Sequence, residues 1–351
     1  MPRRFFVFAV ALSVLTIIAG CAEPQPVPGA TPQVQSAEPE VNKIEPAHTE
    51  VNEPAPILAV SVEEEKPVAV EPNDINQTQM QPAEQQPAPQ EPIKPEYEPA
   101  ADFHDKCASI LKTYVNENGL VDYKTLSRKR IELLSVLDEF KKLDRARYER
   151  WSPQDKTAFW INAYNLHLMR IILENYPIQS PRVLRLIWPP NSIRHIKGIW
   201  DEYKLIIMDE EFTLKEIDTK FLREQAGDPH VFFAVSYACM SSAPLRNEPY
   251  RGEKLPEQLD NQMRRFLAAG QCLKIDRDAR KVYMSAMLKS SWYGDEFVKK
   301  FGTDKKFKEQ EPAVRAVLNF LLNYIPAPDA TYLETGNYTV DYLSFDWTLN
   351  E

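Results

Sequence analysis

The chain is poor in the residues that build several common kinds of functional site. Its 351 residues include only ten glycines, five histidines and four cysteines. They contain no Walker loop, no G-x-G-x-x-G, no H-E-x-x-H and no pair of C-x-x-C motifs. Such motifs usually hold a nucleotide, a dinucleotide or a zinc ion. We therefore expect neither a cofactor nor a metal ion in this protein.

The first twenty residues have the organisation of a signal peptide. Arg3 and Arg4 precede an apolar run that ends in the sequence Ile-Ala-Gly-Cys at Cys21. This run is short for a transmembrane helix and fits the charged, apolar and small-residue regions of a signal peptide. The pattern resembles the bacterial lipobox, which implies cleavage before Cys21 and lipid modification of its thiol. Cys21 would then attach the protein to a lipid membrane in the cell envelope, and Ala22 resembles the signal for outer-membrane delivery in a cell with two membranes.

Residues 21–100 have the composition of a tether. They contain over half of the chain's 29 prolines together with many Gln, Glu and Ala residues, and Tyr97 is their only aromatic residue. Such a segment buries too little apolar surface to fold and acts as an extended spacer. It also carries most of the negative charge, so residues 101–351 are close to neutral. We therefore expect no nucleic-acid partner.

Residues 101–351 are long enough for a single globular domain. Its centre is predicted to be a helix from Ser152 to Pro177, with Ser152 as the cap and apolar residues on nearly every side. The other elements follow from local patterns and predict a mainly helical α+β domain, with short strands and hairpins around this buried helix. We expect helices over 103–115, 132–143, 213–223, 255–269 and 311–324, strands over 203–208, 231–235 and 338–343, and a hairpin of 273–275 with 281–283.

Five blocks of sequence resemble the domain of unknown function 547 family. They occur in order and read AFWINAYN (158–165), DPHVFFAV (228–235), APLR (243–246), WYGDEF (292–297) and FDWTLN (345–350). The family has no established activity, so the resemblance implies an architecture rather than a reaction. Bacterial members typically carry N-C-x-x-x-x-C-P and I-E-H segments. The corresponding positions here are Tyr237, Ser242 and Thr219, which implies that the family's Cys/His pattern is absent.

Two functions remain open. The first, which we favour, is a binding or scaffold domain with a cleft near residues 237–246 for a peptide, a glycan or an envelope protein. Its candidate binding residues are Trp160, Asn162, Asn165, Tyr237, Arg246 and Trp292, although the two asparagines would equally serve to hold a neighbouring loop. The alternative is a hydrolase or acyl-transfer enzyme that acts on envelope peptide or glycan, with Cys239 or Ser242 as nucleophile and His230 or His195 as base.

Three cysteines follow the expected lipidation site. In an exported domain, Cys107, Cys239 and Cys272 allow one disulfide and leave one thiol free. The sequence does not choose between the pairings. A bridge from Cys239 to Cys272 would exclude Cys239 as a nucleophile.

Overall fold

Helix α5 (Pro153–Glu174) is the element around which the others pack. Ser152 caps it by accepting a hydrogen bond from the Asp155 N–H, and Pro153 occupies its first turn, as the sequence predicts. Nearly every side chain from Ala158 to Ile172 is buried. The computed structural model describes residues 96–351, so the expected signal peptide, Cys21 and the tether to residue 95 lie outside it.

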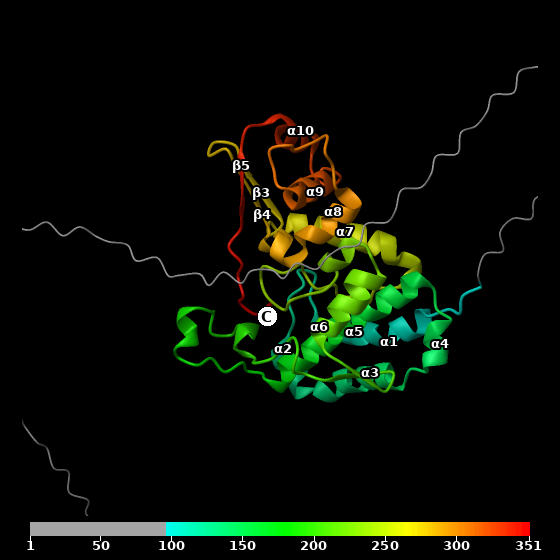
Figure 1. Cartoon of the computed structure of the whole chain (residues 1–351). Helices are drawn as coiled ribbons and strands as arrows, with labels where there is room; N and C mark the ends of the chain where they lie inside the picture. Colours follow the sequence, from blue (N-terminus) through cyan, green and yellow to red (C-terminus); the bar gives the residue numbers. More distant parts are fainter. Residues whose placement is uncertain (1–95) are drawn as a thin grey trace, which may run out of the picture. The chain divides into compact units, whose positions relative to one another are not determined.

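The described residues form a mainly helical α+β domain with two small sheets, as expected from the sequence (Figure 1). Strand β1 (Leu205–Ile207) pairs antiparallel with β2 (Glu210–Phe212). In the second sheet, β4 (Lys281–Met284) lies between antiparallel β3 (Leu273–Asp276) and parallel β5 (Thr339–Tyr342). The other α-helices are α1 (Ala101–Tyr114), α2 (Tyr123–Arg128), α3 (Arg130–Lys142), α4 (Arg145–Glu149), α6 (Leu214–Ile217), α7 (Leu255–Ala268), α8 (Asp295–Phe301), α9 (Pro312–Leu321) and α10 (Ala327–Thr335). The π-helix η3 (Asp218–Gln225) directly continues α6, as predicted for a helix over 213–223. No helix of this part of the chain is long and apolar enough to cross a membrane.

One expected strand is wrong. Residues 229–233 form a 3₁₀ helix, η4 (Pro229–Phe233), instead of the buried strand predicted over 231–235. Asp228 caps this turn because its Oδ1 accepts a hydrogen bond from the His230 N–H, at 3.1 Å. The five apolar residues 231–235 are buried, as expected. A short apolar run shows that a segment is buried but does not distinguish a strand from a helical turn.

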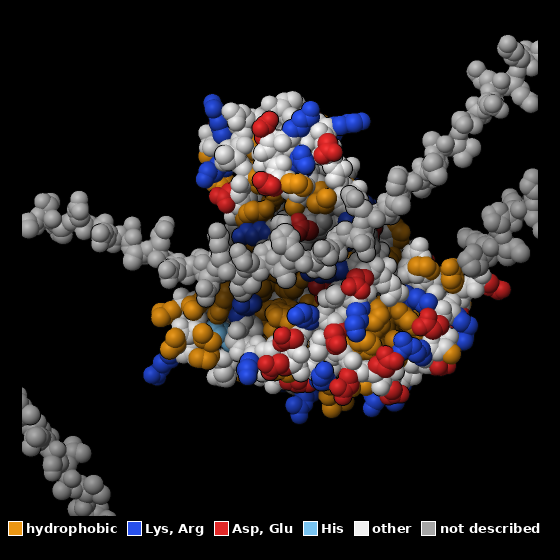
Figure 2. Space-filling view, viewed as in Figure 1, with side chains coloured by type: hydrophobic (Ala, Val, Ile, Leu, Met, Phe, Trp, Pro, Cys, Tyr) orange, Lys and Arg blue, Asp and Glu red, His pale blue; other side chains and the backbone are white. Residues whose placement is uncertain are grey.

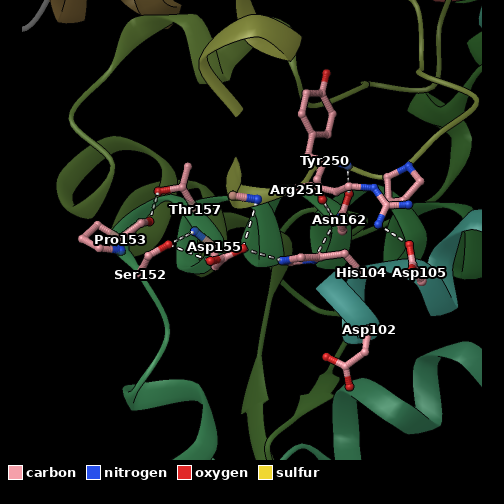
Figure 3. A network of polar contacts seen from close by, with 12 residues as sticks. Asp102, His104, Asp105, Ser152, Pro153, Asp155, Thr157, Asn162, Tyr250 and Arg251 are labelled. Carbon is pink, nitrogen blue, oxygen red and sulfur yellow. Dashed lines mark hydrogen bonds and ion pairs between the residues drawn. The ribbon is translucent and has the colours of Figure 1, made fainter. Parts of the chain in front are cut away.

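A buried polar network joins α1, α5 and the segment 250–252 (Figure 3). The imidazole of His104 lies between Asp155, with Nε2 to Oδ1 at 3.4 Å, and Asn162, with Nδ1 to Nδ2 at 3.3 Å. The Asp155 carboxylate also accepts a hydrogen bond from the Gly252 N–H, at 3.0 Å. Burial alone would raise the pKa of Asp155, but the contacts with His104, Ser152 and Gly252 lower it overall. These contacts fix the loop after Tyr250 to the central helix.

Candidate functional site

A cavity of about 400 Å³ lies beside the central helix. Its lining comes from segments far apart in the sequence, which the fold brings together. The lining residues are Tyr164, Arg194, Trp200, Leu214, Lys215, Asp218, Arg223, Tyr237, Ser291, Trp292 and Trp347. A concave site lined by aromatic rings with a few charged groups is the usual form of a small-ligand site.

Aromatic rings form one wall of the cavity. The rings of Trp292 and Trp347 are stacked, with centroids 5.9 Å apart and planes within 15°. Tyr237 meets Trp292 edge to face at 5.2 Å and meets Trp200 in the same way at 5.4 Å. Tyr237 is buried, whereas the three tryptophans are partly exposed. The wall therefore offers flat apolar surface to a molecule in the cavity.

The C-terminal segment positions Trp347. The Met240 N–H donates to the carbonyl of Thr348 at 2.9 Å, and the Ser241 N–H donates to the carbonyl of Asp346 at 3.2 Å. Cys239 and Leu349 form an antiparallel bridge next to these contacts. The end of the chain is thus held against residues 239–241, which brings Trp347 to the cavity.

A chain of hydroxyl groups lies behind the aromatic wall. Trp292 Nε1 donates to the Tyr237 hydroxyl at 3.3 Å, and the Tyr293 hydroxyl donates to Asp218 Oδ1 at 3.1 Å. The two tyrosine hydroxyls are hydrogen-bonded to each other. Because Tyr293 uses its proton on Asp218, Tyr237 is the donor in that bond. Burial raises the pKa of both phenols, so the chain stays uncharged up to Asp218.

The charged lining residues are mostly cationic. Asp218 is paired with Arg223, with Nε to Oδ2 at 2.9 Å, and Arg223 also donates to the carbonyl of Trp292. The Arg194 guanidinium lies 5.1 Å from the ring centre of Trp347. Within residues 96–351, neither Arg194 nor Lys215 forms an ion pair. Both are exposed, so the cavity carries an excess of positive charge.

The structure brings only some of the predicted binding residues to this cavity. Tyr237 and Trp292 line it, whereas Trp160 is in the core, stacked on Phe221 with ring centroids 3.6 Å apart. Arg246 is turned elsewhere and pairs with Glu248 and Asn261. The residues that sequence reasoning missed are Arg194, Trp200, Lys215, Asp218, Arg223 and Trp347. Trp347 lies in the block 345–350, which could have pointed to it in the way that the block 292–297 pointed to Trp292. The others are separated in the sequence and give no local signal that they meet.

Asn162 and Asn165 hold loop backbone. Asn162 Nδ2 donates to the Tyr250 carbonyl at 2.8 Å, and its Oδ1 accepts from the Tyr250 N–H at 2.9 Å. Asn165 donates to the Ala234 carbonyl and accepts from the Ser236 N–H, both at 2.9 Å. Both side-chain amides therefore hold a neighbouring loop, which was the alternative to a role in ligand binding. Asn165 in this way fixes the segment that leads to Tyr237.

The four candidate catalytic residues are not hydrogen-bonded to one another. Burial raises the pKa of the Cys239 thiol to about 12. The Ser242 hydroxyl accepts a hydrogen bond from the Tyr237 N–H at 2.8 Å. The imidazole of His230 is hydrogen-bonded to Asp228 and Tyr324. The imidazole of His195 is hydrogen-bonded to Ser180 and Pro189. Neither imidazole contacts Cys239 or Ser242 within residues 96–351, so the described structure shows no paired nucleophile and base.

The cysteines of the domain are free thiols. Cys107, Cys239 and Cys272 are all buried, and no disulfide joins them. Burial raises the pKa of each thiol. The disulfide that the sequence allowed is therefore not formed between any pair of them.

Comparison with known proteins gave a family match and nothing further. No curated protein matched the chain, and no solved structure matched it. The segment that matches a family model includes part of α4, all of α5 and most of α7. It also includes residues of the cavity, among them Tyr164, Arg194, Lys215, Arg223 and Tyr237. It does not reach Trp292 or Trp347. Residues 148–267 match the model of the family described as "Protein of unknown function, DUF547".

Proposed function

We propose that the domain is a ligand-binding module of a membrane-anchored lipoprotein. In this proposal the cavity beside α5 holds a carboxylate-bearing part of a glycan or a peptide of the cell envelope, alone or as part of an envelope protein. The observation that carries the proposal is the stacked pair Trp292 and Trp347 beside unpaired cations.

The aromatic wall supports a ligand with a flat, weakly polar face. Tyr237, Trp292 and Trp347 present ring faces and edges that are already held in place by their neighbours. A rigid aromatic surface loses little conformational entropy when a ligand packs on it. Sugar rings and peptide side chains both have faces that suit such a surface.

The charges support a ligand with a negative group. Arg223 is already neutralised by Asp218, but Arg194 and Lys215 have no carboxylate partner within the described residues. A carboxylate bound there would form charge-assisted hydrogen bonds, which are stronger than neutral ones. The same charges would disfavour a cationic ligand.

The membrane anchor is the part of the proposal that rests on the N-terminal sequence. Lipidation at Cys21 would hold the chain at a membrane of the cell envelope, and residues 22–95 would let the domain reach ligands away from that surface. Glu98 and Ala100 already pack on the domain, through an ion pair with Arg150 and burial in the core. A tethered binding domain needs no catalytic residues, which agrees with the lack of a hydrogen bond from Cys239 or Ser242 to an imidazole within residues 96–351.

Tryptophan fluorescence titration tests the binding function. The protein would be the chain from Ala22 onward, and the probes would be oligogalacturonic acid with its methyl ester and a glutamate-rich peptide with its glutamine counterpart. We expect one of the acidic probes to bind and its neutral counterpart to bind more weakly. Lys215→Ala should weaken acidic binding by about tenfold to a hundredfold, as expected for loss of one charge-assisted hydrogen bond worth ~1.5–3 kcal/mol.

A matched control distinguishes the effect of a lysine in the cavity from the effect of the protein's overall charge. Lys220 is also exposed and close in sequence to Lys215 but does not line the cavity. Lys220→Ala should leave the affinity unchanged. Equal binding of the acidic and neutral probes, or an equal loss in both lysine variants, would count against a carboxylate-binding cavity.

A further inference from the structure

The loop between α5 and β1 exposes an apolar tip. It consists of Val183, Leu186 and Ile187, whose exposed fractions are 73%, 88% and 63%. They belong to a short 3₁₀ turn, η1 (Leu184–Leu186), and its flanking residues. In Figure 1 this loop is the green segment that projects at the left, and Figure 2 shows hydrophobic side chains gathered there. These three apolar side chains are therefore not part of the domain's core, and their apolar character needs another explanation.

The base of the loop is held by hydrogen bonds. Arg185 Nε donates to the Ser180 carbonyl at 3.2 Å, and the Ser180 hydroxyl lies 2.9 Å from His195 Nε2. The same nitrogen of His195 lies 2.8 Å from the Pro189 carbonyl. These contacts close the loop below the tip, so the tip projects from a fixed base.

The charged residues of the loop itself are all positive, and the nearest acidic residues in the sequence, Glu174 and Asp201, lie just outside its two ends. The segment from Pro177 to Trp200 contains no Asp or Glu, and it contains four exposed cationic residues, Arg182, Arg185, Arg194 and Lys197. Trp188 is partly buried and lies under the Arg194 guanidinium, at 4.6 Å from the ring centre. An apolar tip, a tryptophan at its edge and a surround of arginines are features of segments that lie in a membrane interface.

We propose that the apolar tip inserts into the interfacial region of a bilayer that contains anionic lipids. Val183, Leu186 and Ile187 would enter the boundary between headgroups and acyl chains, while Arg182, Arg185 and Lys197 would contact lipid phosphates. Three side chains are too few for the core of a stable protein interface, which buries about 800 Å² on each partner. The positive charges of the loop match anionic headgroups and disfavour a second copy of the same loop.

This contact would be separate from the expected lipid anchor. Cys21 precedes the tether, whereas the apolar tip belongs to the folded domain. Trp188 also lies beside Trp347 of the cavity, with ring centroids 6.1 Å apart. Insertion of the tip would therefore bring the cavity close to the membrane surface.

Vesicle sedimentation tests the proposal. The protein is the chain from Ala22 onward, which lacks the signal peptide and the expected lipidation site, and the probes are phosphatidylcholine vesicles with and without phosphatidylglycerol. We expect binding to the anionic vesicles that weakens at high salt. The double variant Leu186→Glu with Ile187→Glu should bind at least about tenfold more weakly, because both side chains would resist entry into the interface.

The control variant changes exposed apolar residues elsewhere. Ile131 and Leu134 on α3 are 71% and 41% exposed, and Ile131→Glu with Leu134→Glu should bind vesicles like the wild type. Arg182→Gln with Lys197→Gln should lose only the part of the affinity that depends on phosphatidylglycerol. Circular dichroism would show that each variant is folded.

Three results would overturn the proposal. One is a wild-type protein that does not sediment with anionic vesicles. Another is equal binding by the wild type and the Leu186/Ile187 variant. The third is self-association of the wild type without vesicle binding, lost in that variant, which would assign the tip to a second copy of the chain. None of these results depends on whether the cavity binds a carboxylate.

Discussion

The imidazole of His167 lies against the ring of Phe140 in the core, with ring centroids 6.3 Å apart. Neither of its nitrogen atoms has a hydrogen-bond partner within residues 96–351. Burial lowers the pKa of His167 to about 3, and the nearby charge of Arg170 acts in the same direction. The folded protein therefore keeps this imidazole neutral at pH values where an unfolded chain would protonate it.

His167 should make the domain sensitive to mild acid. Its pKa in the unfolded chain is near ~6.5, so below that pH the unfolded state binds more protons than the folded state. The free energy of unfolding should fall by up to about 1.4 kcal/mol per pH unit from about pH 6 downward, until the folded pKa is reached. His167→Leu should remove this dependence between pH 6.5 and 4.5 and match or exceed wild-type stability at pH 7. Urea unfolding measured across this pH range would test it.

His104 provides the contrast. It is equally buried but contacts Asp155 and Asn162, so His104→Leu should destabilise the domain at pH 7. The interpretation of His167 is refuted if the wild type and His167→Leu lose stability in parallel as the pH falls.

The two asparagines of α5 should be required for stability rather than for binding. Asn162→Ala would leave the N–H and carbonyl of Tyr250 without partners in a buried region, at about 1–3 kcal/mol for each unpaired group. Asn165→Ala should act similarly through Ala234 and Ser236. Chemical denaturation would measure both losses, with Asn118→Ala, at an exposed turn, as a control of small effect. Wild-type stability in either α5 variant would show that these contacts contribute little.

The thiols of the folded domain should be unreactive. Burial raises the pKa of Cys107 and Cys239 to about 12 and that of Cys272 still further, so only about one thiol in ten thousand is ionised at pH 8. A thiol-directed reagent should label none of the three at an appreciable rate in the native protein, and all of them after unfolding. Rapid labelling of Cys239 at neutral pH would instead indicate an activated thiolate and support the enzyme alternative.

Lipidation should depend on Cys21. In cells fed a fatty-acid probe, the wild-type protein should be labelled and Cys21→Ala should not be, because the lipobox cysteine is the expected site of modification. The Cys107→Ala variant is a matched control and should be labelled like the wild type. Normal labelling of Cys21→Ala would refute the lipobox interpretation.

Local signals predicted four of the five strands of the described residues and the helices α1, α3, α5, α6, α7 and α9, but not α2, α4, α8, α10 or β2. The Ser152 cap with Pro153, and the capping box of Thr213 with Glu216, are formed as the sequence indicates. The strand predicted over 231–235 is wrong because local signals conflict there. Asp228 followed by Pro229 is itself a helix-start pair, with Asp at the cap and Pro in the first turn, and this local signal overrides the strand-like apolar run after it.

The cavity was less accessible to sequence reasoning. Tyr237, Trp292 and Trp347 are all aromatic and lie in or near the family blocks, but only the backbone contacts with residues 240 and 241 show that Trp347 meets the other two. Arg194 and Lys215 look like ordinary surface cations in the sequence. They can bind a ligand carboxylate only because no Asp or Glu of the described residues pairs with them. This lack of partners is a property of the tertiary structure and not of local spacing.

Equilibrium dialysis against a soluble digest of cell envelope would test the binding cavity most directly. The wild-type chain from Ala22 onward should concentrate acidic glycan or peptide fragments, identified by mass spectrometry, and the Lys220→Ala control should do the same. The double variant Lys215→Ala with Trp347→Ala should retain far less of these fragments, because it lacks one cation and one stacking ring of the cavity. Equal retention by the wild type and the double variant, or no retention by the wild type, would contradict the proposed function.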